Sequence, residues 1–336
     1  MAIIISASEL ASSTSEIVGY KSGLALSLRE MKNLIHEYDS ASLLNRSGTI
    51  RIYPEEFEQL IADLLFRVGN IPSNSTIPQD IAFYHKIKNN PKKLRVFQNV
   101  QREFISFMTT SLNTKKNIKD NKINPTSFLI SSASHGKFGL ECAMTLLESV
   151  NHKIHISPWN SIRRQEYRSS IELSDLFKSS SLEAEFGNFI DQRFIDFLSN
   201  NFGSIDSMHW RKFEGLTAEF FDRNGFDVIM GPGSDDGGVD IRVYKKSQLK
   251  TDPATILIQC KRSKSKIQKA IVKSLWADVM YENAESGLIV TTSAIAPGAR
   301  NDCIARGYPI HEANRETIRA WLTQMKTPGK GVFMGE

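Results

Sequence analysis

The stretch FDVIMGPGSDDGGVDIRVY, residues 226–244, decides the fold of the last third of this chain. Its two apolar runs flank a cluster of glycine and aspartate, which is typical of two strands joined by a turn. The next apolar run, TILIQCK at 255–261, predicts a third strand that contains Gln259 and Lys261. Strands in a sheet core rarely carry acidic, amide and basic side chains together, so Asp240, Gln259 and Lys261 require an explanation.

Length and composition set the broad class of the protein. With 336 residues the chain is long enough for two or three domains, and 40% hydrophobic with 24% charged residues is ordinary for a globular protein in water. No apolar run reaches about 18 residues and the start lacks a basic lead, so neither a membrane span nor a secretory signal is predicted. Three widely spaced cysteines argue against a disulfide scaffold or a zinc site and predict a cytoplasmic protein.

Helical spacing surrounds the three strands. Residues 208–225 predict a helix that ends at Gly225. After the third strand the pattern predicts, in order, a helix at 266–283, a strand at 286–292, a helix near 296–306, a short strand and a closing helix at 314–325. The order αβββαβ with an αβα extension indicates an α/β fold built on a mixed sheet.

The first 205 residues have a weaker pattern. Apolar residues at helical spacing in 53–69 predict a helix. The segment SFLISSASHGKFGLECAMTLLESVNHKIHISPW, residues 127–159, predicts strand, loop, helix and strand, which is a βαβ unit. The chain then returns to helix over 160–205, where EAEFGNFIDQRFIDFLSNN at 183–201 is strongly amphipathic. The expected organisation is a helical and partly basic region at 1–125, a βαβ and helical segment at 126–205, a domain at 206–325 and a tail at 326–336.

Strand alternation indicates how the polar residues meet. Gln259 and Lys261 share one face of their strand, and pairing with the preceding strand brings Asp240 to the same end of the sheet. Metal-dependent phosphodiester hydrolysis needs a hard oxygen ligand such as Asp240, a further oxygen such as the Gln259 amide, and a cation such as Lys261. The carbonyl of Cys260 completes the expected shell for Mg²⁺, with Mn²⁺ as a substitute. The alternative is an exposed hairpin with surface charges.

These segments resemble the PD-(D/E)XK nuclease superfamily, and most closely its Mrr-type restriction endonuclease branch. The match rests on KFEGLTAEFFDRNGF, DDGGVDI, QCKR and the later strand GLIVTTS, and it covers about residues 208–323. The resemblance implies catalytic roles for Asp240, Gln259 and Lys261. It also implies that Glu214, on the preceding helix, is an additional acidic metal ligand.

Two residues depart from the superfamily pattern. Val239 stands where the superfamily has proline, and Gln259 stands where it has a second acid, which removes a negative charge and puts a second metal ion in doubt. Glu219 competes with Glu214 for the role of additional ligand. It lies about 140° around the helix, so the two cannot both point at one metal. For Asp236 a role in the turn is favoured.

A weaker resemblance involves residues 127–159, which look like the opening of TIR-like nucleotide-binding domains, where a strand ends in serines before a helix. It covers about thirty residues and leaves the function of this Rossmann-like fragment open. The histidines have no partner at catalytic spacing and are expected to be structural.

Positive charge is concentrated between Lys86 and Lys122, where ten Lys and Arg residues face two acids. A solvated basic helix and a nucleic-acid contact surface explain this run equally well. On the second interpretation the DNA contacts are Lys92, Lys93 and Arg95, together with Arg262 beside the catalytic lysine.

The sequence therefore predicts a Mg²⁺-dependent endonuclease that hydrolyses DNA, in restriction or anti-phage defence. The alternatives are a catalytically silent binding module and a nuclease gated by a nucleotide that the N-terminal region senses. Lys261 argues against a silent site, which has no need of a cation there. The expected partners are DNA and a defence-system protein, with no membrane, and homo-oligomerisation is left open.

Overall fold

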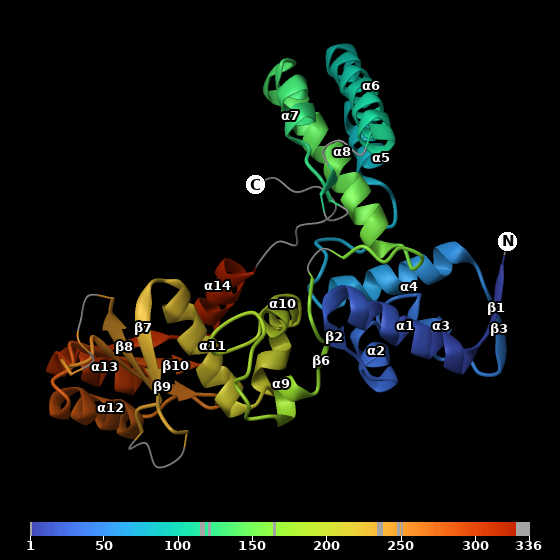
Figure 1. Ribbon diagram of the computed structural model, residues 1–336. Helices are drawn as coiled ribbons and strands as arrows, with labels where there is room; N and C mark the ends of the chain where they lie inside the picture. The colour runs from blue at the N-terminus through green and yellow to red at the C-terminus, as the bar shows by residue number, and fades with distance from the viewer. Residues whose placement is uncertain are drawn as a thin grey trace. The chain divides into compact units, whose positions relative to one another are not determined.

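The chain forms two compact units, which Figure 1 shows in a computed structural model. The first unit ends at Ile171 and the second begins at Glu172, within the segment that the sequence assigned to 126–205. No helix in the described part of the chain is both long and apolar enough to cross a membrane. The structure describes residues 2–114, 118–119, 122–163, 166–233, 238–246, 249 and 251–326.

The first part of unit 1 packs short helices beside a small sheet. The helices begin where the sequence supplies caps, because Ser6 and Ser27 each form a capping box with a glutamate three residues on. The helix predicted at 53–69 is confirmed, with Pro54 in its first turn and Gly69 at φ +82° after its end. The elements are β1 (Ile3–Ser6), α1 (Ala7–Ser22), β2 (Leu24–Ala25), α2 (Leu28–Leu34), α3 (Ala41–Leu44), β3 (Thr49–Ile52), antiparallel to β1, and α4 (Pro54–Arg67).

The second part of unit 1 is a group of helices, which Figure 1 shows. Aromatic residues form much of the core between them. Asn90 caps the longest helix through the N–H of Lys93. Phe128 packs its ring against Phe104 and Phe107 at centroid distances of 5.2 and 5.6 Å, which joins two of the helices. The elements are α5 (Gln79–Ile87), α6 (Pro91–Thr114), the hairpin β4 (Ile118–Lys119) and β5 (Lys122–Ile123), α7 (Thr126–Ala133), α8 (Gly136–Ile156) and, at the unit boundary, β6 (Ile171–Glu172).

The βαβ unit predicted at 127–159 is wrong, because α7 and α8 occupy this segment. Short apolar runs fit a strand and a buried helix equally well, and here packing against α6 selects the helix. Gly139 allows α8 to pass close to α7, since a Cβ there would lie 2.3 Å from the carbonyl oxygen of Ser132. With no strand in this segment, the resemblance to TIR-like domains loses its basis.

Unit 2 begins with short elements where the sequence predicted continuous helix. They are α9 (Asp175–Lys178), α10 (Gln192–Asn200) and the 3₁₀ turn η1 (Phe202–Asp206). Residues 183–191 are not helical, which corrects the amphipathic helix expected there. Asp191 caps α10, and Gly187 turns the chain at φ +135°, a conformation that glycine adopts readily.

The core of unit 2 is a five-stranded mixed sheet in the order β11-β10-β9-β8-β7. β7, β8 and β9 are antiparallel neighbours, whereas β9, β10 and β11 run parallel. Both the mixed sheet and the order αβββαβ predicted from the sequence are confirmed. The elements are α11 (Trp210–Arg223), β7 (Phe226–Met230), β8 (Ile241–Lys245), β9 (Ile256–Lys261), α12 (Lys269–Tyr281), β10 (Ser286–Thr291), α13 (Pro297–Arg306), β11 (Ile310–Ala313) and α14 (Arg315–Met325).

Helices cover both faces of this sheet (Figure 1). On one face Leu257 and Ile289 join a core with residues of α12 and α13. On the other face Cys260 contacts Thr217 of α11, because successive strand residues point to opposite faces. The polar end of β9 is therefore enclosed between helical layers.

Candidate active site

Asp240 lies immediately before β8, at the end of β9 that carries the polar residues. Ile241 pairs with Ile258 and the Asp240 N–H donates to the Ile258 carbonyl at 2.9 Å, so Asp240 comes opposite Gln259. The Asp240 carboxylate accepts the N–H of Cys260 at 2.6 Å and is buried. Since strand N–H groups point along the sheet, this bond holds the carboxylate close to the sheet plane.

The alternation of side chains between the two faces of the sheet is interrupted at Asp240. Val239 and Tyr244 belong to the same core cluster, although strict alternation would send them to opposite faces. The strand therefore starts after Asp240, at Ile241, and the residues before it follow a different path. Asp240 therefore does not follow the regular alternation of side chains between the two sheet faces that the sequence suggested.

Gln259 is a buried amide with an unsatisfied oxygen. The residue is 5% exposed, and its Oε1 has no hydrogen-bond partner among the described residues. Gly238 leaves room for the amide, because a Cβ there would lie 3.1 Å from Gln259 Nε2 and its φ is +97°. Leaving a buried carbonyl oxygen unpaired costs free energy, and such an oxygen is a ligand that hard cations accept.

Lys261 ends β9 beside Thr291 of β10. It shares the face of Gln259 by alternation, as predicted, and its side chain is half-buried. Within the described ranges no hydrogen bond or ion pair engages its ammonium group. The end of β9 thus combines an unpaired amide oxygen with a cation.

The two glutamates of α11 have different surroundings. Glu214 is buried and pairs with Arg211, whose Nη1 lies 2.7 Å from Oε2 and whose Nη2 donates to the Gly231 carbonyl. Glu219 accepts the N–H groups of Asn188 and Phe189, each at 2.8 Å, and pairs with Arg223. Glu219 therefore anchors the turn before α10, whereas the arginine that pairs with Glu214 also binds the Gly231 carbonyl directly after β7.

The Cys260 thiol is buried on the face of β9 that packs against α11. Burial raises its pKa well above the ordinary range, and the negative charges of Asp240 and Glu214 raise it further, against the Thr217 hydrogen bond and Lys261. The thiol stays protonated and is no nucleophile, which agrees with the structural role expected for this side chain.

The donor set can be tested for a metal ion. In the part of the chain that the structure describes, no three His, Cys, Asp or Glu side chains form a metal-binding group. The Asp240 carboxylate, held by the Cys260 N–H, comes opposite Gln259, whose amide oxygen has no partner among the described residues. These all-oxygen donors fit one hard cation such as Mg²⁺ rather than zinc. Asp236, expected to shape the turn, lies outside the described residues.

His209 and Arg211 complete the surroundings of Glu214. The Nδ1 of His209 accepts the N–H of Arg211 and caps α11. Burial lowers the pKa of His209, and the charges of Arg262 and Lys212 lower it further, so the ring is neutral at pH 7. Sequence reasoning missed Arg211, although its position three residues before Glu214 on one helix face was a usable signal.

The expected DNA-binding cations fall into both units. Arg262 follows Lys261, is exposed, and donates to the Asp206 carbonyl at 3.1 Å. Lys92, Lys93 and Arg95 lie exposed in the first turns of α6, in unit 1. The ammonium of Lys93 lies 5.0 Å from the ring centre of Phe138.

Unit 2 holds a mixed sheet with polar residues where β8 enters beside the end of β9. Within this unit, residues 205–322 match the Mrr catalytic family, described as restriction endonuclease. The Mrr-like nuclease domain expected from the sequence is thereby confirmed, at nearly the predicted bounds.

Two individual proteins are also similar to this chain. The uncharacterized protein y4cE of Sinorhizobium fredii is 31% identical over 96 residues, which cover 29% of this chain. The matched part spans only 25% of that relative's length. The solved structure of the MspJI restriction endonuclease in complex with a 27-mer oligonucleotide is 18% identical, with a TM-score of 0.31, over 55% of this chain and 40% of that one.

Proposed function

We propose that this protein is a Mg²⁺-dependent endonuclease that hydrolyses DNA phosphodiester bonds, in restriction or anti-phage defence in the cytoplasm. The observation that carries the proposal is the buried amide oxygen of Gln259, which has no hydrogen-bond partner in the described part of the chain and lies opposite Asp240, two residues before Lys261. An ordinary structural glutamine would satisfy this oxygen within the protein. A cation ligand explains why it is left open.

The oxygen donors would hold one metal ion. Asp240, Glu214, Gln259 Oε1 and the Cys260 carbonyl are the proposed ligands. When bound, Mg²⁺ polarises a phosphoryl oxygen and lowers the pKa of its water. The bond from the Cys260 N–H fixes the Asp240 carboxylate in orientation, and a carboxylate accepts several contacts at once. Because Gln259 is neutral, the set favours a single ion over a pair.

Lys261 is proposed to act on the phosphate. Its half-buried ammonium has no partner of its own in the described part of the protein, so it can pair with a phosphate oxygen or orient the attacking water. Partial burial strengthens this interaction, because the local dielectric constant is lower than that of bulk water.

Recognition of DNA is proposed to involve both units. Arg262 lies next to the proposed catalytic lysine, and Lys92, Lys93 and Arg95 project from α6. Exposed cations of this kind contact phosphates without reading sequence. In this division, residues 206–325 carry the chemistry and residues 1–205 recognise DNA or a defence-system partner.

A binding module without catalysis is the second candidate. The missing charge at Gln259 favours it, since a neutral ligand weakens metal binding. Lys261, which has no partner among the described residues, favours catalysis, because a cation two residues from Gln259 can orient the attacking water.

Incubation of the full-length protein with plasmid DNA distinguishes the two candidates. Supercoiled DNA, modified and unmodified, is followed on gels with Mg²⁺ and with EDTA. We expect nicking or cutting that EDTA abolishes and that Asp240→Asn and Lys261→Ala each reduce at least about a thousandfold. Both variants should keep the wild-type melting temperature. Cleavage that persists in EDTA would exclude the metal site, and DNA binding without cleavage on every substrate would select the binding module.

A further inference from the structure

A groove between α6 and α7 in unit 1 has the features of a ligand site. It has a volume of about 440 Å³, within the range of small-molecule sites. The residues from α6 recur at helical spacing, so one face of that helix forms a wall. The lining residues are Glu103, Ser106, Phe107, Thr110, Ser111, Ser127, Phe128 and Ser131.

The groove combines hydroxyl groups with one carboxylate. Glu103 Oε2 accepts the hydroxyl of Ser131 at 2.8 Å, and Oε1 lies 2.7 Å from Nε2 of His135. Burial raises the pKa of Glu103, but these hydrogen bonds and the charge of His135 outweigh it and leave the pKa below its ordinary value. The carboxylate is therefore ionised at neutral pH and presents acceptor capacity toward the groove.

The buried hydroxyl of Ser111 is a second indication that the groove binds a ligand. It is 1% exposed, it lines the groove, and its hydroxyl has no hydrogen-bond partner among the described residues. A buried hydroxyl left unpaired costs roughly 1–3 kcal/mol, and a bound molecule with a donor or acceptor would remove that cost. This observation is independent of the geometry of Glu103.

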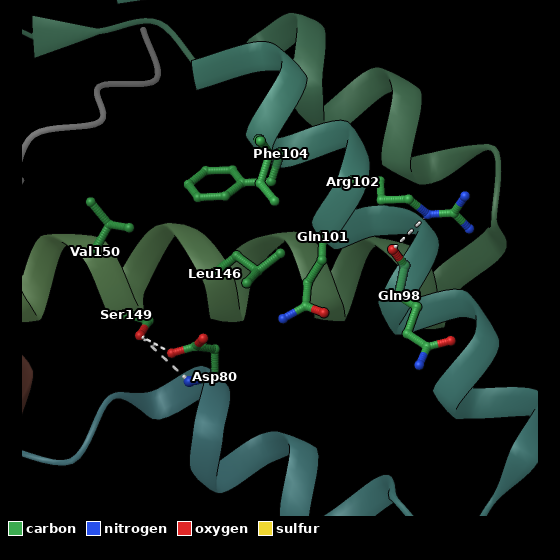
Figure 2. A pocket seen from close by; sticks show the side chains of 9 residues that line it. Asp80, Gln98, Gln101, Arg102, Phe104, Leu146, Ser149 and Val150 are labelled. Atoms are coloured by element: carbon green, nitrogen blue, oxygen red, sulfur yellow. Dashed lines mark hydrogen bonds between the residues drawn. The ribbon is translucent and has the colours of Figure 1, made fainter. Parts of the chain in front are cut away.

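The opposite face of α6 supplies a contrast. Gln98, Gln101 and Arg102 line a second hollow of about 580 Å³, which Figure 2 shows from close by. There the Asp80 carboxylate accepts the hydroxyl of Ser149, so the buried polar groups of this hollow satisfy each other. The second hollow therefore provides control residues on the same helix.

We propose that the α6–α7 groove binds a neutral nucleoside. Glu103 would accept the adjacent hydroxyls of a ribose, since a carboxylate matches two neighbouring donors. The serines and Thr110 would donate to or accept from the base edge. Phe107, stacked on Phe128 at 5.6 Å and 19°, would contact the base.

Charge favours a nucleoside over a phosphorylated ligand. None of the described lining residues is a lysine or an arginine, and the ionised Glu103 repels a phosphate. The site lies within unit 1 and does not depend on the nuclease assignment, so either can fail without the other.

Calorimetry on the full-length protein tests the site with adenosine, guanosine, cytidine and uridine. Their 2′-deoxy and 5′-monophosphate forms and free ribose complete the panel. We expect at least one ribonucleoside to bind, with its 2′-deoxy form about tenfold weaker because one hydroxyl contact to Glu103 is lost. If none of the four binds, or if only the monophosphates bind, the proposal is wrong. Equal affinity for free ribose would reduce the site to a sugar site and overturn the base contact.

Variants separate binding from folding. Ser111→Ala should weaken nucleoside binding about fivefold or more, while the melting temperature without ligand stays the same or rises, because the variant removes an unpaired buried hydroxyl. Glu103→Gln should weaken binding at least tenfold. Gln101→Ala, in the hollow of Figure 2, should change neither property. Unaltered affinity in Ser111→Ala and Glu103→Gln would place the nucleoside elsewhere.

Discussion

Two regions of unit 2 contain buried charged or polar side chains, and they use their hydrogen-bonding capacity differently. At the turn before α10, Glu219 accepts two backbone N–H groups and pairs with an arginine, and Asp191 holds the buried Arg193 through both carboxylate oxygens. At the end of β9, Gln259 keeps an unpaired buried oxygen and Lys261 has no partner in the described residues.

The difference distinguishes a structural cluster from a candidate site. A buried charge whose every lone pair is occupied stabilises a particular turn, and removing it destabilises the fold. A buried polar atom without a partner costs stability and is kept where a ligand supplies the partner. The two regions differ in whether their buried polar atoms have hydrogen-bond partners, and not in the residue types they contain.

The largest expected effect is on stability, at the turn. Glu219→Ala removes the acceptor of two backbone N–H groups and leaves Arg223 without its carboxylate. The free energy of unfolding should fall by about 2–4 kcal/mol, measured by urea denaturation. The protein that remains folded should cleave DNA at the wild-type rate.

Glu214→Gln is the matched variant on the same helix and should show the reverse pattern. The amide still accepts a hydrogen bond from Arg211, so unfolding should change by less than about 1 kcal/mol. Cleavage should fall about a hundredfold because a proposed metal ligand loses its charge. If Glu219→Ala harms cleavage of the folded protein more than Glu214→Gln does, the assignment of the acids is wrong.

A middle-sized effect is expected from Gln259→Glu, which places a charge where the unpaired oxygen lies. A second carboxylate opposite Asp240 raises affinity for a divalent cation. The Mg²⁺ concentration that gives half of the maximal thermal stabilisation should fall about tenfold. Without metal the variant should melt at a lower temperature than wild type, because two carboxylates repel each other.

Gln268→Glu is the control for that experiment, since Gln268 is an exposed glutamine in the same unit. It should leave the Mg²⁺ dependence unchanged. An equal response of both variants to Mg²⁺, or none in either, would show that Gln259 does not face a cation site.

The smallest effect is expected on α6, whose cations belong to neither buried cluster. Reversing Lys92, Lys93 and Arg95 to glutamate should weaken DNA binding about fivefold at physiological salt and flatten its salt dependence, because phosphate contacts release counterions. Cleavage at saturating DNA should survive. Fluorescence anisotropy at several salt concentrations measures both quantities.

A charge-matched control uses three other exposed cations, Arg29, Arg46 and Lys178. Their reversal to glutamate should lower affinity less and leave the salt slope close to wild type. If both triple variants behave alike, the effect of α6 reflects net charge and the basic run is an ordinary solvated surface.

The sequence predicted unit 2 better than unit 1, and the reason is local. In 226–325 each apolar run was bounded by glycine, proline or charged residues, so the strands and helices had clear ends. In 127–159 the runs were short and their boundaries ambiguous, and contacts with α6 decided for helix. The helix expected over 183–191 failed because Glu219, distant in sequence, holds a turn there.

For the candidate site, the sequence by itself determined which residue types stand on neighbouring strands and that Gln259 and Lys261 share a face, because alternation is a property of the backbone. Tertiary structure alone decided that the Asp240 carboxylate binds the Cys260 N–H, that Arg211 holds Glu214, and that Glu219 serves a turn. It alone decided that the Gln259 oxygen has no partner among the residues that the structure describes. Whether a hydrogen bond is satisfied depends on atoms brought together from distant segments, which no local pattern encodes.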